Sequence, residues 1–392
     1  MIAWALLLAA AAAGPSAACT LCHPAVRVEF EQGVHRREGV TCVSCHGGDP
    51  GAVSVEAAHR GAFRGVPRRR DIPKLCASCH ADIALMRPYN LPADQYALYE
   101  TSRHGLLLAQ GNERVAVCTD CHGAHEIRRP DDPRSSVFRR NIPRTCARCH
   151  ADPSRMGGTG PRDDPYRDYA EGVHGRAFLT RDNLSAPDCS SCHGAHGAAP
   201  PGFGDIDKVC GQCHATTRAY FLEGPHYAAM REAGLPECAS CHDHHRIGPA
   251  DLSALDSACV ACHEEGSDQL EVAAAMRTLF TAAAEEIDRA RALVERAAAI
   301  PLYVGDYEAG LEDARTALME SFPVMHSLDV QRVQDFTLRA RSIATAIQSE
   351  IEGKLEGRAW RRVGLMLFWF YLLLTVAILV RFRRRAAAEA LR

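Results

Sequence analysis

Lysine and aromatic residues are scarce in this chain of 392 residues. Only Lys74, Lys208 and Lys354 occur among 45 Lys and Arg, and 48 Asp and Glu balance these cations. The chain therefore lacks the strongly basic field that nucleic-acid binding requires. Aromatic residues make up 6% of the sequence, which is little for filling the interior of so long a chain. Something other than side chains is expected to fill part of the core.

Cysteine is absent after residue 262, yet 18 cysteines precede that point. All of them fall into nine copies of one pattern, Cys-x-x-Cys-His, so none remains for disulfides. The cysteines are Cys19, Cys22, Cys42, Cys45, Cys76, Cys79, Cys118, Cys121, Cys146, Cys149, Cys189, Cys192, Cys210, Cys213, Cys238, Cys241, Cys259 and Cys262. The motif histidines are His23, His46, His80, His122, His150, His193, His214, His242 and His263.

This pentapeptide is typical of covalent c-type haem attachment. Two thiols on one helical turn can each bond a vinyl group of one porphyrin, and the adjacent His then supplies a proximal nitrogen to the iron. Zinc knuckles, thioredoxin-like redox pairs and a disulfide framework are the alternatives. A zinc or disulfide framework gives no reason for a His after every second Cys. The sequence therefore predicts nine covalently attached haem c groups.

Ten histidines lie outside the motifs and are candidates for the second axial ligand of each iron. Eight of them recur in register, either before a motif or three residues after a motif His. Methionine is the main competing ligand, but eight Met are too few. For His326 the alternative is a capping or core role. His244 is out of register and is the one non-motif histidine not assigned as a ligand. The expected distal ligands are His35, His59, His104, His125, His174, His196, His226, His245 and His326.

The order of the motifs predicts one haem followed by four di-haem repeats within residues 19–266. We expect a mostly α fold with little regular structure around a packed haem array. After residue 267 the apolar periodicity becomes helical. Helices are predicted at about 268–299, 306–320 and from 329 onward, forming a bundle or stalk over residues 267–358. Arg-rich stretches such as residues 68–70 are candidates for pairing haem propionates.

Both ends of the chain carry apolar segments. Residues 2–13 are too short to span a bilayer and predict a signal peptide over residues 1–18. Residues 363–380 form an uncharged run that predicts one transmembrane helix within residues 359–385. The arginines after it predict a cytoplasmic tail at residues 386–392. The expected location is a single-pass protein of the bacterial inner membrane, with the haem region in the periplasm.

With these motifs and the repeated CHGAH segments, the chain resembles the exported multihaem c-type cytochromes with paired CxxCH motifs. That group spans cytochrome c3 and the superfamily of nitrite reductase and hydroxylamine oxidoreductase. The resemblance implies electron transfer between the quinone pool or a membrane partner and periplasmic acceptors. The implied partners are a quinol-oxidising membrane protein, periplasmic cytochromes and the membrane, with no nucleic acid.

The main alternative function is a multihaem reductase or oxidase of a small nitrogen or sulfur compound, with one open haem. Many of the resembling nitrite reductases carry Lys in place of a motif His, and this chain has no such motif. No catalytic residue is therefore expected, and electron transfer without catalysis is the preferred hypothesis. A polymeric extracellular wire is disfavoured by the predicted membrane anchor.

Overall fold

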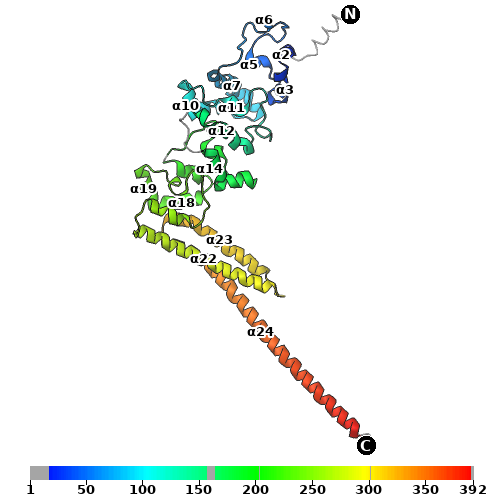
Figure 1. Cartoon of the computed structure of the whole chain (residues 1–392). Helices are drawn as coiled ribbons and strands as arrows, with labels where there is room; N and C mark the ends of the chain where they lie inside the picture. Colours follow the sequence, from blue (N-terminus) through cyan, green and yellow to red (C-terminus); the bar gives the residue numbers. More distant parts are fainter. Residues whose placement is uncertain (1–16, 157–163, 203, 301, 390–392) are drawn as a thin grey trace. The chain divides into compact units, whose positions relative to one another are not determined.

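The computed structural model describes residues 17–156, 164–202, 204–300 and 302–389 (Figure 1). Within these ranges there is no strand, and helices are the regular elements. The predicted mostly helical fold is therefore confirmed. The core of the expected signal peptide, Pro301 and residues 390–392 of the predicted tail lie outside the described residues. The chain divides into two compact units, Met1–Val209 with Cys238–Ala250, and Cys210–Glu237 with Asp251–Arg392.

The first unit consists of short helices joined by loops, as the density of motifs predicts. Its helices are α2 (Ala17–Cys22), α3 (Pro24–Gln32), α4 (Val34–Arg37), α5 (Cys42–His46), α6 (Val55–Ala58), α7 (Ile72–His80), α8 (Ile83–Met86), α9 (Gln95–Thr101), α10 (Arg103–Ala109), α11 (Cys118–His122), α12 (Ile142–His150), α13 (Pro153–Met156), α14 (Pro165–Glu171), α15 (Val173–Gly175), α16 (Cys189–His193) and α20 (Ala239–His242). The turns η1 (Arg69–Asp71), η2 (Arg87–Tyr89), η3 (Arg139–Asn141) and η4 (Arg176–Thr180) complete it.

The second unit holds the three long helices of the C-terminal half. Its elements are α18 (Ala215–Glu223), α19 (Pro225–Ala233), α21 (Ala254–Ser257), η5 (Cys259–Ala261), α22 (Asp268–Ala298), α23 (Gly305–Val324), η6 (Met325–Ser327) and α24 (Val330–Glu389). The division between the units falls within α17 (Ile206–Gly211). The two short helices α18 and α19 thus group with the C-terminal helices.

The near-identical helices α7 and α12 show why the motifs form helical turns. Each begins one residue before a buried proline, Pro73 or Pro143. Proline is tolerated there because the first-turn N–H groups have no intrahelical acceptor, and its fixed φ suits the helix. Both helices run for nine residues and end at the motif His. The motif therefore occupies the last turn and a half of a preorganised helix.

The helical bundle is built on the predicted apolar faces. Phe280 and Ile287 of α22, Ala314 of α23, and Ala340 and Ile351 of α24 are all buried. They belong to two clusters that run along the three helices. One cluster also includes Leu255 and the half-buried Cys259 and Tyr220. The bundle therefore packs onto the segment that carries the last motif and is more than a plain stalk.

One helix, α24, joins the bundle to the apolar C-terminal run without a break. It spans 60 residues, about 90 Å at 1.5 Å per residue. Its first part packs on α22 and α23, and the rest extends beyond them (Figure 1). Of the 18 residues Val363–Val380, all but the half-buried Thr375 are exposed, and α24 is long and apolar enough to cross a membrane. A candidate transmembrane helix is therefore present, continuous with the bundle.

Candidate functional site

Short motif helices place two thiols and one imidazole on a single turn. In α5, α11 and α16 the helix is the five-residue motif itself. Thiols at positions i and i+3 lie on the same side of a helix. In α11 both cysteines, Cys118 and Cys121, are half-buried, and the pKa of Cys121 is raised to about 11 by burial. The Cys121 thiol is therefore protonated at neutral pH.

A left-handed residue after the motif helix turns the chain back on itself. The motif helices α11 and α16 end at Gly123 and Gly194, with φ of 79° and 77°. Glycine adopts this conformation without a Cβ penalty. Asp243 takes the same conformation, φ 64°, after the eighth motif. The turn carries the histidine that lies two residues after it away from its own motif.

Each of seven motif histidines faces one histidine from outside the motifs. The ring centres lie 6.0 to 6.4 Å apart in all seven pairs. The pairs are His23 with His59, His80 with His35, His46 with His125, His150 with His104, His122 with His196, His193 with His245, and His263 with His226. The partner always comes from another part of the chain.

This separation suits a metal between the two rings. A metal–imidazole bond is about 2 Å long, so two rings on opposite sides of one metal have centres about 6 Å apart. Two other contacts of histidine rings are shorter. His59 stacks on Phe63 at 4.2 Å, and His244 lies 4.6 Å from His245. The donor set, two imidazoles with two adjacent thiols, fits a c-type haem.

Burial keeps many of these imidazoles neutral. It lowers the pKa of His122 to about 4, with smaller contributions from His196 and His80. Burial likewise lowers the pKa of His104 and His245. Neutral imidazole is the form that binds a metal. His46 Nδ1 lies 2.8 Å from the Gly65 carbonyl oxygen. Donation from Nδ1 leaves Nε2 as the nitrogen with a free lone pair.

The histidines outside the motifs are held in docked pairs of turns. Val34 N–H donates to the Ile127 carbonyl oxygen at 2.7 Å, and Val173 N–H donates to that of Ile247 at 2.9 Å. Arg103 N–H donates to Ala198 in the same way, at 2.9 Å. In each bond the donor is the residue before one non-motif His, and the acceptor is the residue two positions after a second non-motif His. The docked histidines are thus His35 with His125, His104 with His196, and His174 with His245.

Glycines make this close approach possible. A methyl group at Gly33 would lie 2.7 Å from the His125 carbonyl oxygen, and one at Gly172 would lie 2.8 Å from that of His245. Gly224 has the same relation to His326, at 2.8 Å. Pro225, which follows, lacks the N–H that donates in the other copies. The turn at His326 is therefore a further copy of this docking, which sequence reasoning missed because the segment around His326 does not resemble those around His125 and His245.

Four histidines of the predicted site fall outside the seven pairs. They are His174, His214, His242 and His326, each of which has other interactions. His326 lies in η6, with Nδ1 3.2 Å from the Pro323 carbonyl oxygen. His244, which is not assigned as a ligand, is 71% exposed and lies 3.0 Å from an Asp243 oxygen. Among the described residues, no group of three or more His, Cys, Asp or Glu forms a metal-ion cluster.

Thiols of successive motifs approach one another in the first unit. Hydrogen bonds join three pairs, Cys19 with Cys42, Cys76 with Cys118, and Cys146 with Cys189. At the intervening steps the thiols interact electrostatically, Cys45 with Cys79 and Cys121 with Cys146. Neighbours along the chain are thus neighbours in space for the first six motifs.

Arginines lock adjacent motif helices together. Arg69 of η1 pairs with Asp120 of α11 at 2.5 Å, and it donates to the Val115 carbonyl oxygen. Arg139 of η3 pairs with Asp188, at the start of α16, at 3.3 Å. Arg68, Arg69 and Arg70 all pair with carboxylates of the chain itself. The expected pairing of these three arginines with haem propionates therefore competes with their ion pairs to carboxylates of the protein.

Comparison with known families supports the interpretation of the motifs. Residues 34–151 match the cytochrome c3 family, and residues 183–219 match the family of doubled CXXCH motifs. No curated protein and no solved structure matches the chain. The two family matches support a multihaem c-type cytochrome with covalently bound haem and a role in electron transport.

Proposed function

We propose that this protein is a membrane-anchored nonahaem c-type cytochrome of the bacterial periplasm. It relays electrons between the quinone pool, or a membrane partner, and periplasmic acceptors. A bound haem supplies a one-electron iron couple. The protein supplies the attachment thiols, the axial imidazoles and the spacing between sites. The observation that carries the proposal is the set of seven histidine pairs with one common separation.

Both axial positions are filled by histidine at each site in this proposal. The seven pairs account for seven sites. His174 and His326 serve the two motifs that remain, those of His214 and His242. The docked turns support this assignment, because the His326 carbonyl approaches Gly224 as closely as the His125 and His245 carbonyls approach Gly33 and Gly172. Filling every axial position leaves no iron open to a substrate, which favours relay over catalysis.

The ligands follow a regular offset along the chain. The His after the fourth motif faces the second motif, and the same offset joins the sixth to the fourth and the eighth to the sixth. The His before the second motif faces the third, and the His before the fourth faces the fifth. Each docked pair of turns thus serves two consecutive motifs. This regularity supports duplication of a di-haem module, with His59 and His23 outside it.

A linear path follows for the first six sites. Thiols of successive motifs approach one another at every step from the first to the sixth motif. Electrons would pass in chain order through this part of the protein. The run Val363–Val380 anchors the chain in the membrane, with the motifs on the periplasmic side.

Two measurements on purified full-length protein test the proposal. Intact mass and a pyridine haemochrome assay are expected to give nine haems per chain. Electronic and electron paramagnetic resonance spectra are expected to be low-spin throughout. A mass for seven or fewer haems contradicts the count. A native high-spin haem that binds cyanide or nitrite contradicts relay and supports the alternative, a reductase or oxidase with one open haem.

A further inference from the structure

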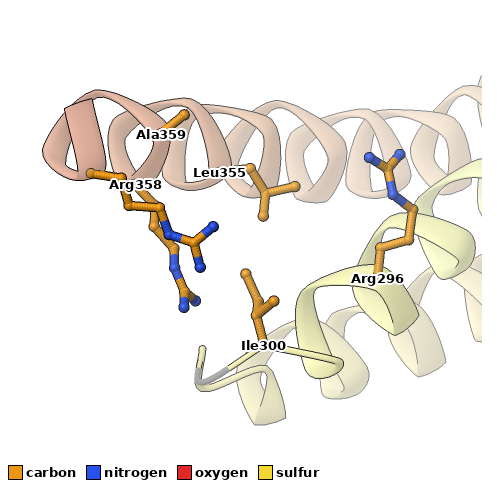
Figure 2. Close-up of a pocket in the computed structure, with 6 residues that line it drawn as sticks. Arg296, Ile300, Leu355, Arg358 and Ala359 are labelled. Carbon is orange, nitrogen blue, oxygen red and sulfur yellow. The ribbon is translucent and has the colours of Figure 1, made fainter. Parts of the chain in front are cut away.

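A basic pocket lies between the end of α22 and the middle of α24. Its volume is about 270 Å³, and half-buried Ile300 and Leu355 form its apolar part. Arg296 contributes from α22, while Arg358 and Arg362 contribute from α24. Figure 2 shows Arg296 and Arg358 from the two helices on either side of Leu355. The three guanidinium groups make one part of the pocket cationic, and the two aliphatic side chains make the other part apolar.

The arginines of this pocket differ from most other arginines of the bundle. None of the three has an ion pair or side-chain hydrogen bond with the residues that the structure describes. Elsewhere on the bundle the arginines pair with carboxylates, as in Arg289 with Glu286, Arg291 with Asp288, Arg315 with Glu312, Arg332 with Glu223, and Arg339 with Glu320. Three cations without carboxylate partners around one pocket favour an anionic ligand.

The position of the pocket next to the apolar run indicates which kind of anion it binds. Arg362 immediately precedes the apolar run Val363–Val380. Leu355, Arg358 and Arg362 follow the spacing of one helix face. Trp360, 75% exposed, lies at the same level of the helix and is typical of a membrane interface. The pocket therefore lies where the phosphates of a bilayer meet the first part of their acyl chains.

We propose that this pocket binds the phosphodiester headgroup of an anionic phospholipid in the periplasmic leaflet. This inference rests on the membrane anchoring in the proposed function. The arginines would hold the phosphate oxygens, since the planar guanidinium matches phosphate geometry. Ile300 and Leu355 would contact the glycerol and the upper acyl chain. The lipid would then hold the end of α22 against α24 at the membrane surface.

The proposal also accounts for an exception to the distribution of charge. Arg358, Arg361 and Arg362 lie on the periplasmic flank of the span, where cations oppose the positive-inside rule. Arg361 Nε donates to the Gly357 carbonyl oxygen within its own helix and does not line the pocket. A lipid phosphate offsets part of the positive charge of the two flank arginines that do line it. Arg361 thereby offers a matched control of equal charge at the same depth.

The test uses full-length, haem-loaded protein in nanodiscs of phosphatidylcholine with a minor fraction of phosphatidylglycerol. Native mass spectrometry after release counts the phosphatidylglycerol molecules retained. The wild type and Arg361→Gln are expected to retain the lipid. The triple variant Arg296→Gln, Arg358→Gln, Arg362→Gln is expected to retain at least tenfold less. Equal retention by wild type and triple variant overturns the proposal.

Two further arms separate the sources of phosphate and the possible causes of failure. Addition of inorganic phosphate is expected to leave retention unchanged, and displacement at millimolar phosphate overturns the lipid assignment in favour of a soluble anion. Hydrogen exchange at α22 and α24 identifies a triple variant that has lost its fold. In that case, single Arg296→Gln protein, expected to lose retention severalfold, decides the question. Failure of the protein to insert into nanodiscs contradicts the membrane anchor instead, so the two failures are distinguishable.

Discussion

His46, in the second motif, faces His125, which follows the fourth motif, with ring centres 6.2 Å apart. The segment that carries one motif thus supplies a ring to another motif. The turn before His125 begins at Gly123, where a positive φ directs the chain away from His122. His122 faces His196 instead. If these pairs bind iron, each site is completed by a distant part of the chain, and haem attachment and folding depend on each other.

The first prediction tests whether His125 is the distal ligand of the haem at the second motif, which it faces, and not of the haem at the fourth motif, which precedes it. His125→Ala is expected to convert one haem to high spin, because the iron of the second motif loses its distal ligand. His125→Ala is expected to cause the same conversion in protein that lacks the fourth haem through Cys118→Ser/Cys121→Ser. It should cause no conversion in protein that lacks the second haem through Cys42→Ser/Cys45→Ser. Electron paramagnetic resonance of each purified variant is the measurement.

The control for this experiment is His244→Ala. His244 is exposed and pairs with Asp243, so its removal should leave all spectra unchanged. A high-spin signal from His125→Ala that disappears together with the fourth haem, and persists without the second, would contradict the assignment.

The second prediction concerns the acid stability of the bundle. Glu286 of α22 accepts hydrogen bonds from Arg289 at 2.6 Å and from Gln348 of α24 at 2.7 Å. The bond from Arg289 is the main reason that the pKa of Glu286 is lowered. A carboxyl with a lowered folded pKa stabilises the fold above its unfolded pKa, and this contribution is lost as the pH falls through the folded pKa.

Glu286→Gln is therefore expected to destabilise the bundle by about 1 kcal/mol at pH 7. The difference from wild type should begin to shrink near the ordinary carboxyl pKa of about 4 and disappear only below the lowered pKa of Glu286. Hydrogen exchange of α22 and α24 peptides in urea, at several pH values, is the measurement. Glu285→Gln is the control, because Glu285 is 64% exposed and lies 3.8 Å from Arg289. An equal loss in both variants, or a loss that persists at low pH, would show that the ionised Glu286 carboxylate contributes nothing specific.

The elements of the C-terminal half could be predicted closely from the sequence. The apolar spacing predicted a helix at about 268–299, and α22 spans Asp268–Ala298. Met276, Phe280 and Val294, which recur at helical spacing in this segment, are buried. Periodicity suffices here because each helix buries one continuous stripe against its neighbours. The unbroken passage from bundle to apolar run was missed, although the absence of proline between 330 and 389 is a signal for it.

The pairing of histidines could not be predicted in the same way. The sequence marks which histidines are available, but their partners depend on contacts between turns far apart in the chain. His59 lies between the second and third motifs and faces His23 of the first. The docking of Gly33 against the His125 carbonyl depends on a close backbone approach, which no local pattern encodes. Hydrogen bonds such as that from Val34 to Ile127 appear only once the fold is known.

The third prediction uses the continuity of α24. Truncation after Glu356 removes the apolar run but keeps Ile351 and Leu355, the last residues of α24 in the bundle core. The product is expected to be soluble and fully loaded with haem. Truncation after Ser349 also removes those two side chains and should destabilise the bundle by about 2 to 5 kcal/mol. Fractionation, haem content and hydrogen exchange are the measurements. Retention of the first product in the membrane would show that a second anchor exists.

The last prediction decides between relay and catalysis through His326. His326→Ala is expected to create one high-spin haem and to leave the other eight low-spin, whereas His244→Ala changes nothing. The helices next to η6 should also exchange hydrogen faster, because a ligand bond would fix the position of this turn. If His326 were only a structural residue, the exchange rates would change without any change of spin state.

Gly224→Ala tests the same assignment without touching an imidazole. Its new methyl group would lie 2.8 Å from the His326 carbonyl oxygen and must displace that turn. A partly high-spin haem with the signature of His326→Ala is expected. Gly248→Ala is the control, because a methyl group there meets no atom within 4 Å. If Gly224→Ala perturbs the spectrum as His326→Ala does, the docked turn positions a ligand. If both variants keep the wild-type spectrum, His326 is not a ligand. The haem then has another distal ligand, or it has none and is the open haem that the enzyme hypothesis requires.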